Sequence, residues 1–376
     1  MWKRPRRRVA RAAQHATGLA TPGQLFRWKF RRHRLAVISL GLLVVLYGVA
    51  ILAEFIAPND PYQTSANLVY APPQRLYFVD AGGSLHIPPF VYPQVKAVNP
   101  TTLRVTYTED KTTKLPVGLL VHGWRYRFLG LVETDLHLFG MEHGTIGAWG
   151  RDALGRDLLS RLILGSRISL SIGLVGVFVG FLSGLLLGGL AGLKGGRTDL
   201  AIMRVSEIFG SIPTLPIWMV LAAILPQNWT VEQTYIAMTL ILALFGVVSG
   251  ASRTIRGRFF ALREEEFVMA ARLDGAGTGR LIRRYLFPHV LSQEIADITM
   301  AIPGMILAET ALSFLGLGLQ APAISWGVLL QEGRSVQTLA YSPWLFIPAI
   351  VVIVTVLAFN FVGDGIRDAA DPYARV

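Results

Sequence analysis

The feature that most constrains this chain is a set of apolar segments, each about as long as a membrane is thick. A helix needs about 20 apolar residues to cross the hydrocarbon core of a bilayer. Pro213, Pro216 and Pro303 interrupt two of the segments, which is tolerated where neighbouring helices satisfy the freed backbone groups. We therefore predict an all-α polytopic membrane protein with six transmembrane helices, near residues 35–56, 168–191, 205–226, 234–252, 291–316 and 343–363.

Composition agrees with this class and excludes some chemistry. The chain has 376 residues, of which 52% are hydrophobic and 16% are charged, whereas soluble domains carry about 25% charged residues. It has no cysteine, so disulfides, thiolate metal sites and a cysteine nucleophile are excluded. In the segment GLVGVFVGFLSGLLLGGLAGLKGG a small residue recurs at nearly every third or fourth position. Such spacing lets transmembrane helices approach closely, which predicts that the second span packs on other helices.

The distribution of positive charge predicts an orientation. Residues 1–34 hold eleven Lys and Arg residues and no acid. Such a run binds nucleic acid in some proteins, but beside a membrane span it is typical of a cytoplasmic flank. We interpret it as a basic cytoplasmic tail and expect no nucleic acid partner. The same orientation places the loop 253–290, with its eight arginines, inside, and the loop 227–233, which has no Lys or Arg, outside.

One large segment, residues 57–147, falls outside the membrane. Its runs RLYFVD, TLRVTYTED, LPVGLLVH and WRYRFLG alternate aromatic and β-branched residues with polar ones between Pro and Gly breaks. This pattern predicts a small β-rich extracytoplasmic insert. Its histidines, by contrast, have spacings that match no metal-site template, so we expect surface or packing roles and no metal site for His86, His122, His137 and His143.

The segment REEEFVMAARLDGAGTGRLIRRYLFPHVL, residues 263–291, is a charged interruption between two apolar spans. Its glycines suggest a phosphate loop, but a P-loop ends in Gly-Lys-Ser/Thr and a dinucleotide fingerprint follows a strand. Here the glycine-rich run ends in Gly-Arg, and the stretch before it has the composition of a helix, so we expect no nucleotide site. We predict instead a helix that ends at Asp274, with Gly275 as a left-handed cap.

A second helix is predicted over residues 278–287, ended by Pro288. Its arginines lie largely off its apolar stripe, which is formed by Leu281, Ile282, Tyr285 and Leu286. A short helix with two faces fits a groove on a partner protein or a lipid surface. The periodicity leaves both possibilities open.

The same segment resembles the cytoplasmic "EAA" loop of the permease subunits of binding-protein-dependent ABC importers. The family pattern is E-A-A, three residues, G, nine residues and I-x-L-P. Ala270, Ala271, Gly275 and Pro288 occupy the alanine, glycine and proline positions. Met269 stands where Glu is usual, and Glu266 is the nearest substitute. The resemblance implies a coupling loop over residues 253–290, with ATPase-coupling roles for Glu266, Ala270, Ala271, Gly275, Ala276, Gly277, Arg280 and Pro288.

Further segments narrow the resemblance. DALGRDLLSRLILGSRISL, ETALSFLGLG, ISWG and FNFVGDGIRDAADPY are similar to the dipeptide, oligopeptide and nickel group, in its second type of permease, which has a basic N-tail and an extra N-terminal span. The family resemblance implies a type I ABC importer permease domain over residues 166–365 and a cytoplasmic C-tail over 364–376. It also implies the cytoplasmic (inner) membrane of a prokaryote, with both termini cytoplasmic.

The resemblance also implies a set of partners, which follow from the mechanism of such importers. Two ABC ATPase subunits, which bind ATP and Mg, would move the coupling loop and so exchange outward-open and inward-open states of the spans. The other expected partners are a homologous second permease, an extracytoplasmic solute-binding protein and membrane lipid. The chain itself is expected to have no catalytic residue, metal or cofactor and not to be an enzyme.

Two further sets of residues are candidates for roles in transport. Polar residues inside a span are candidates by default for the translocation pathway, and here they are Glu309, Thr310, Ser313 and Asn360. Packing between helices is the alternative role for Glu309. Residues 148–167 are predicted to form an amphipathic elbow on the outer face, where a partner contact or simple membrane anchoring would involve Asp152, Arg156, Asp157 and Arg161.

The sequence fits an importer permease better than other classes of function. A peptide or similar small solute is the expected substrate, with nickel or an oligosaccharide as the alternative within the same class. A stand-alone secondary transporter often shows internal repeats, and none is convincing here. A membrane-embedded hydrolase needs a nucleophile with a base, but the only histidine between residues 168 and 363 is His289, in the charged loop.

Overall fold

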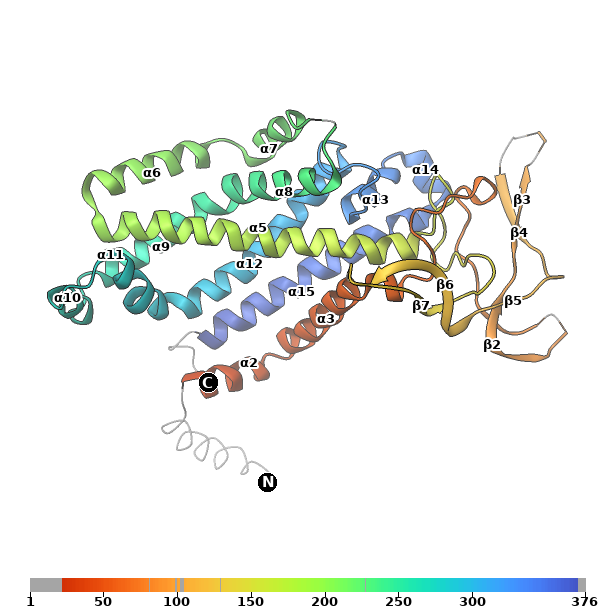
Figure 1. The fold of residues 1–376 in the computed structure, drawn as a ribbon, viewed down its shortest axis with the longest axis horizontal. Coiled ribbons are helices and arrows are strands. Elements are labelled where there is room, and N and C mark those ends of the chain that lie inside the picture. The colour runs from red at the N-terminus through yellow and green to blue at the C-terminus, as the bar shows by residue number, and fades with distance from the viewer. Residues whose placement is uncertain are drawn as a thin grey trace, which may run out of the picture.

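The computed structural model describes residues 22–370, except 81, 99, 102–104, 129 and 227. Figure 1 shows a bundle of long helices with a group of short strands at one end. The chain enters the bundle through α2 (Pro22–Arg32), α3 (Arg34–Ile51) and α4 (Ala53–Ile56). It then forms the strands and returns as α5 (Leu158–Lys194), a 37-residue helix about 55 Å long at 1.5 Å per residue.

Two bent helix pairs and two long helices complete the bundle. The first pair is α6 (Gly196–Ser211) and α7 (Thr214–Ala223), which meet at 86°. Pro213 lies at this bend, as N-cap of α7. The second pair is α8 (Val231–Leu242), which continues through the π-helical turn η2 (Ala243–Val248) into α9 (Ser249–Leu262), with a bend of 45°. The long helices are α12 (Phe287–Phe314) and α15 (Ile347–Ala370).

The predicted spans agree in number with the helices if each bent pair counts as one. Within the described residues, four helices are long and apolar enough to cross a membrane, and the two bent pairs raise the number to six. The all-α membrane class is therefore confirmed. The second and fifth spans are longer than predicted, because α5 already begins at Leu158 and the fifth span runs without interruption over Thr278–Phe314.

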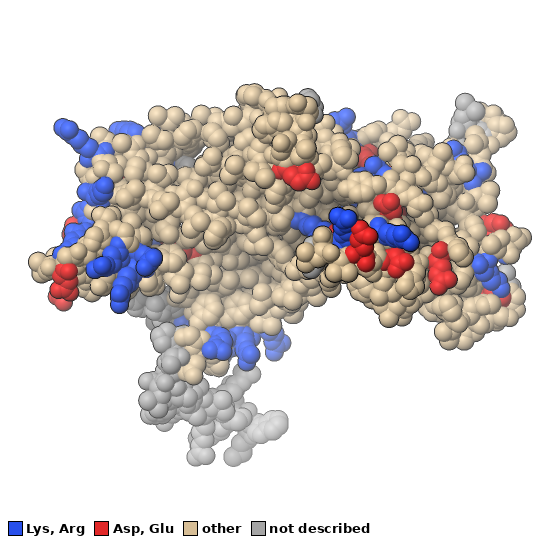
Figure 2. Space-filling model, in the orientation of Figure 1, with Lys and Arg blue, Asp and Glu red and all other residues tan. Residues whose placement is uncertain are grey.

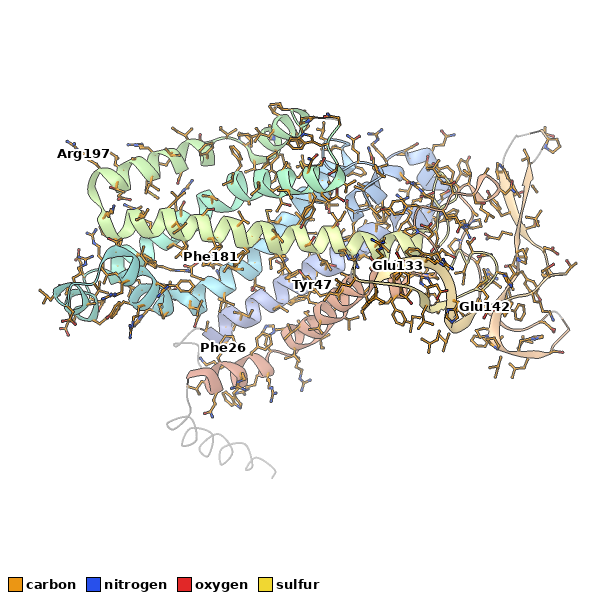
Figure 3. The ribbon with its side chains drawn as sticks, viewed as in Figure 1. Phe26, Tyr47, Glu133, Glu142, Phe181 and Arg197 are labelled. Atoms are coloured by element: carbon orange, nitrogen blue, oxygen red, sulfur yellow. The ribbon has the colours of Figure 1, made fainter. Side chains whose placement is uncertain are left out.

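Glycines explain how closely α5 and α9 pack. A methyl group added at Gly192 would lie 2.8 Å from the Arg256 carbonyl oxygen, and one at Gly188 would collide with the Ser252 carbonyl oxygen. The two backbones are therefore in contact, as the glycine pattern predicts. Elsewhere in the bundle, the Tyr47 ring of α3, labelled in Figure 3, lies edge-on to Phe359 of α15, with ring centroids 6.3 Å apart.

The strands form three small antiparallel sheets, which confirms the β-rich insert. One has the order β1 (Tyr77–Val79), β2 (Leu85–Val91), β5 (Leu115–Pro116), and the others pair β3 (Gln94–Val98) with β4 (Val105–Glu109) and β6 (Gly118–Phe128) with β7 (Val132–Gly140). His137 is fully buried, and its ring nitrogens lie 3.0 Å from the Glu54 carbonyl oxygen and 2.9 Å from that of Trp124. It ties β7 to α4.

Short helices close the bundle beside the strands. The N-caps of α13 (Trp326–Glu332) and α14 (Val336–Tyr341) are Ser325 and Ser335, whose hydroxyls accept backbone N–H bonds. The 3₁₀ turns η1 (Ala66–Leu68) and η4 (Pro343–Phe346) lie in the connecting segments. At the other end of the bundle, α10 (Glu266–Leu273), α11 (Thr278–Arg280) and the π-helical turn η3 (Leu281–Leu286) form a separate turn (Figure 1). Arg197 lies at the same end, where α5 gives way to α6 (Figure 3).

Candidate functional site

The segment between α9 and α12 forms a compact turn at the end of the bundle away from the strands (Figure 1). It contains α10 (Glu266–Leu273), α11 (Thr278–Arg280) and η3 (Leu281–Leu286). α10 ends where predicted, with Asp274 as C-cap and Gly275 at φ +79°. The Gly275 N–H donates to the Arg272 carbonyl and the Ala276 N–H to that of Ala271, both at 3.0 Å. Glycine fits this left-handed position without a Cβ penalty.

The second helix of the turn does not end at Pro288, contrary to the sequence prediction. The chain continues through η3 directly into α12, and the Phe287 N–H donates to the Ile282 carbonyl, five residues back. Proline has no N–H and its ring clashes with the carbonyl four residues earlier in a regular α-helix. The wider π-helical turn just before Pro288 relieves this clash, so α11, η3 and α12 form one continuous helix.

One face of the turn is packed against the bundle. Val268, Ala271, Leu281 and Leu286 are at most 5% exposed and form one cluster with Phe259 of α9 and Phe181 of α5. Leu281 and Leu286 belong to the predicted apolar stripe, and Ile282 and Tyr285 pack against the same cluster. The stripe thus faces the protein itself and is not a free surface.

The opposite face of α10 is exposed and partly apolar. Leu273 is 89% exposed and Met269 is 49% exposed. Glu266 and Ala270 are exposed beside them, and Figure 2 shows both acidic and basic side chains gathered at this end of the molecule. Residues three and four apart share a helix face, so Glu266 and Met269 lie next to each other. We call this surface, formed by Glu266, Met269, Ala270 and Leu273, the α10 face.

The remaining predicted coupling residues fall into two groups. Gly275, Gly277 and Arg280 are exposed on the turn, Pro288 is exposed at the start of α12, and Ala276 is half-buried. Ala271 is only 3% exposed, so it holds α10 on the bundle and does not belong to the α10 face.

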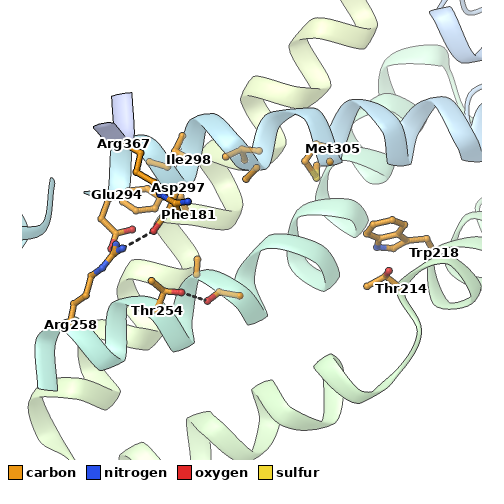
Figure 4. A pocket seen from close by; sticks show the side chains of 15 residues that line it. Phe181, Thr214, Trp218, Thr254, Arg258, Glu294, Asp297, Ile298, Met305 and Arg367 are labelled. Carbon is orange, nitrogen blue, oxygen red and sulfur yellow. Dashed lines mark hydrogen bonds and ion pairs between the residues drawn. The ribbon is translucent and has the colours of Figure 1, made fainter. Parts of the chain in front are cut away.

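A cavity of about 690 Å³ opens between α5, α7, α9, α12 and α15. This volume lies within the range of about 300–1,000 Å³ that is usual for small-molecule sites. Trp218, Thr214 and Met305 line one part of it, and a charged group lines another (Figure 4). The charged group consists of Arg258, Glu294, Asp297 and Arg367, which we call the cavity ion cluster.

Arg258 connects the two helices that flank the turn. From α9 its guanidinium donates to the Glu294 carboxylate and, at 2.8 Å, to that of Asp297, both on α12. The Glu294 side chain is only 3% exposed. Arg367 of α15 lies 3.7 Å from Asp297. Because α9 and α12 are the two arms of the turn, the cavity ion cluster ties these arms together at the wall of the cavity.

The structure places the predicted pathway residues away from this cavity. Glu309 is fully buried in α12, and its carboxylate accepts hydrogen bonds from Ser313 at 2.9 Å, Ser325 at 2.7 Å and Ser169 at 3.3 Å. It therefore joins α12, α5 and the N-cap of α13, which is the packing role. Thr310 and Ser313 are buried in the same contact, and Asn360 is half-buried on α15 without lining the cavity.

The second half of the predicted elbow is part of a long helix, and three of its four candidate contact residues are buried within the protein. Residues 158–167 are the first turns of α5, and Asp152, Asp157 and Arg161 are at most 1% exposed. Asp157 is the N-cap of α5 and accepts from the Ser160 N–H at 2.9 Å. The amphipathic pattern reflects packing against the protein, because one side of these turns meets α4 and β7.

The charges of the predicted elbow form an internal network. Arg156 donates to Asp152 at 2.6 Å and to Glu332 of α13 at 2.9 Å, and Arg161 lies 3.4 Å from Asp152. Burial raises the pKa of the Glu332 carboxyl, and the charge of Asp152 raises it further, against the lowering effect of Arg161. The network therefore fixes the start of α5 to α13.

Sequence reasoning missed the cavity ion cluster. In the sequence, Arg258 is one of the eight arginines of the predicted loop 253–290, whereas in the structure it lies on α9 and reaches into the bundle. Glu294 and Asp297 lie in the predicted fifth span, so the rule that an ionisable residue inside a span is a functional candidate would have found them. In the part of the chain that the structure describes, no group of three or more His, Asp or Glu side chains is placed to hold a metal ion.

Comparison with known proteins covers most of the helical bundle. The family model described as binding-protein-dependent transport system inner membrane component matches residues 184–376. A second model, the N-terminal TM domain of oligopeptide transport permease C, matches residues 21–73. The chain is 40% identical over 230 residues to the oligopeptide transport system permease protein OppC of Haemophilus influenzae, which covers 60% of this chain and 70% of that protein.

Two further comparisons give similar coverage. The dipeptide transport system permease protein DppC of Bacillus subtilis is 40% identical over 231 residues, which is 60% of this chain and 69% of DppC. A chain from inward-facing structures of the MetNI methionine ABC transporter aligns with 20% identity and a TM-score of 0.42, over 57% of this chain and 98% of that one.

Proposed function

Because this chain belongs to the family of binding-protein-dependent transport system inner membrane components, we propose that it is a permease subunit of an ATP-driven importer for peptides. The relatives named above are permeases of oligopeptide and dipeptide transport systems, which favours a peptide over nickel or an oligosaccharide. The chain is a transport subunit and not an enzyme. ATP and Mg are assigned to partner ATPase subunits, and this chain needs no cofactor of its own.

The observation that carries the proposal is the α10 face. Leu273, 89% exposed, and Met269, 49% exposed, form an apolar patch bordered by the acid Glu266, and an apolar patch rimmed by polar residues is typical of a contact with another protein. Glu266, Met269 and Ala270 surround Leu273 on a short helix, which is the form that docks into a groove. We assign this face to the ATPase, in agreement with the position of the family's coupling loop. Glu266, next to Met269, then supplies the acid that the family usually has at position 269.

The way the turn is held to the bundle supports a lever mechanism. The turn is continuous with α9 on one side and, through η3, with α12 on the other. Its buried face packs on Phe259 and Phe181, so the turn cannot move without α9 and α5. Movement of the ATPase groove would therefore be transmitted to the helices that line the cavity, as a switch between two packed states.

The cavity is assigned to the translocation pathway. It is mostly apolar, and it carries two acids and two arginines at one side. A peptide offers both apolar side chains and a charge at each terminus, so this lining suits it. We assign the rest of the pathway to a homologous second permease and the delivery of the substrate to an extracytoplasmic binding protein.

Charge supports the orientation of the chain in the cytoplasmic membrane. The exposed arginines of the turn, Arg272, Arg280, Arg283 and Arg284, lie at the end of the bundle away from the strands. Helix α2 packs against α15. Both α2 and the C-terminal end of α15 lie toward the same end of the bundle as the turn, away from the strands (Figure 1). The positive-inside rule assigns this end to the cytoplasm and the strands to the outside.

The test is to place a charge on the α10 face. We expect Leu273→Asp to weaken co-purification with the ATPase at least thirtyfold, which corresponds to the loss of a hot-spot contact of about 2 kcal/mol. ATP-dependent uptake of a radiolabelled tripeptide, by cells that carry the chain with its partner genes, is expected to fall in parallel. Leu273 touches little of its own protein, so the thermal unfolding midpoint should not change.

The matched control is Val336→Asp, because Val336 is 85% exposed but lies on α14, beside the strands. It should leave ATPase co-purification unchanged. Unchanged co-purification of Leu273→Asp with the ATPase would exclude the α10 face as the contact. Uptake of nickel or an oligosaccharide by the wild-type system, in place of peptide, would correct the substrate alone.

A further inference from the structure

The helix α2 presents a positively charged face that the transport function does not use. Its residues Arg27, Trp28, Arg31 and Arg32 are exposed, and they follow the spacing i, i+1, i+4 and i+5 that places them on one side of a helix. No acid occurs in the chain before Glu54. Figure 2 shows Lys and Arg side chains gathered at the lower edge of the molecule, where α2 lies in Figure 1.

The opposite side of α2 is fixed to the bundle. Phe26 and Phe30 are partly buried and stack with ring centroids 6.3 Å apart. α2 packs against α15, and a methyl group added at Gly365 of α15 would lie 3.2 Å from the Phe30 ring. The helix is thus held in place by its aromatic side, and its arginines point away from the protein.

The position of α2 determines what faces these arginines. It ends at Arg32, two residues before the membrane-spanning helix α3, whose first turns expose Leu35 and Ile38. Exposed leucine and isoleucine at the start of a span face lipid, so α2 lies at the level of the headgroups. Trp28 is 37% exposed, and the Arg32 guanidinium lies 4.7 Å from the centre of its ring. Tryptophan and arginine together on an amphipathic helix are typical of a helix in the membrane interface.

We propose that the Arg27, Trp28, Arg31 and Arg32 face of α2 is a binding surface for anionic phospholipid headgroups. Guanidinium groups form paired hydrogen bonds with phosphate, and each basic residue near an anionic membrane surface strengthens binding about fivefold. The three arginines together account for about a hundredfold preference for phosphatidylglycerol over phosphatidylcholine. Because α2 is bound to α15 through Phe30, occupation of this surface stabilises the packing of α15 in the bundle.

The test measures how lipid stabilises the full chain. The purified chain in detergent is titrated with phosphatidylglycerol or phosphatidylcholine, and the thermal unfolding midpoint is followed. We expect phosphatidylglycerol to raise the midpoint at about a hundredfold lower concentration than phosphatidylcholine, and high salt to abolish the difference. The variant R27Q/R31Q/R32Q should lose this difference, and R27K/R31K/R32K should retain most of it.

A matched control removes three exposed arginines elsewhere, in R197Q/R283Q/R284Q, and should keep the wild-type response. If it loses the response to the same extent as the α2 variant, the effect is one of total charge and the proposal is wrong. The proposal also fails if soluble glycerol phosphate reproduces the stabilisation. It fails too if the α2 variant responds to phosphatidylglycerol as the wild type does but no longer co-purifies with the ATPase, since the surface is then a protein interface.

Discussion

The buried pair between Arg258 and Glu294 allows a prediction whose size follows from the structure. The Glu294 side chain is 3% exposed and that of Arg258 is 22% exposed. Replacing Arg258 with Met removes the partner of a buried carboxylate, and breaking a buried pair in this way costs about 3–5 kcal/mol. Asp297 is 35% exposed, so its loss of Arg258 adds less than about 1 kcal/mol. We expect Arg258→Met to destabilise the chain by about 4 kcal/mol.

The double variant Arg258→Met/Glu294→Leu distinguishes the net contribution of the ion pair from the cost of leaving Glu294 buried without a partner. When both charges are replaced by apolar groups of similar size, the change is often neutral or stabilising. The double variant should therefore be within about 1 kcal/mol of the wild type, although Arg258→Met alone is strongly destabilised. The difference is the interaction energy of the pair, as a double-mutant cycle defines it.

The assay is reversible unfolding of the purified chain in mixed micelles, with the fraction of helix followed by circular dichroism. Arg204→Met is the control, because Arg204 pairs with Glu207 at 3.0 Å on an exposed helix face, where the expected cost is about 0.5 kcal/mol. A cost below about 1 kcal/mol for Arg258→Met would refute the reasoning. So would a double variant as unstable as the single one.

Three further predictions concern packing and pH. Gly188→Ala should destabilise the chain by about 1–3 kcal/mol, because the new methyl group meets the Ser252 carbonyl oxygen. Gly257→Ala in α9 has open space around it and should be neutral or stabilising. Unfolding in denaturant measures both changes. Glu309→Leu should cost about 2–4 kcal/mol by leaving the hydroxyls of Ser169, Ser313 and Ser325 without their acceptor, and Glu309→Gln should cost less. Hydrogen bonds from Lys114 and His86 hold the pKa of Asp80 below its usual value of 3.8. The stability that Asp80 gives the turn before β2 is therefore present above pH 3.8 and lost as the pH falls below it. The protection of the Ser84 amide, which is its exchange rate relative to that of an unstructured peptide at the same pH, should therefore fall at low pH in the wild type but not in Asp80→Asn.

Local chemistry explains which features of the turn could be predicted from the sequence. Gly275 follows a helix and can adopt φ > 0 without cost, so the end of α10 depends on neighbouring residues alone. Pro288 also has a strong local preference, but here the outcome depends on the π-helical turn before it. That turn is held by Leu281 and Leu286, which pack on residues of α5 and α9 far away in the sequence. Tertiary packing therefore decided whether the helix ended.

The predicted pathway and elbow residues show a limit of reading polar groups from a sequence. Glu309 and Arg161 are charged residues in apolar surroundings, which fits a cavity and a buried network equally well. Three serines from separate elements satisfy Glu309, and Asp152 and Glu332 lie beside Arg161. Some of these partners are far apart in the sequence; Arg161 and Glu332, for example, are separated by 171 residues. Residue spacing alone could therefore not identify them.

The double variant Arg258→Met/Glu294→Leu also tests whether the cavity ion cluster has a role in transport beyond stability. If the cluster only holds α9 to α12, the apolar pair restores both stability and peptide uptake. If the charges must separate and become hydrated when the cavity opens, the apolar pair should instead resist exposure to water and keep α9 and α12 together. The cluster lines the cavity and Arg367 reaches it from α15, so opening would expose its charges to water, where they are well solvated. We therefore expect the double variant to be as stable as the wild type but at least tenfold slower in uptake, with normal ATPase co-purification. Uptake at the wild-type rate would assign the cluster to stability alone.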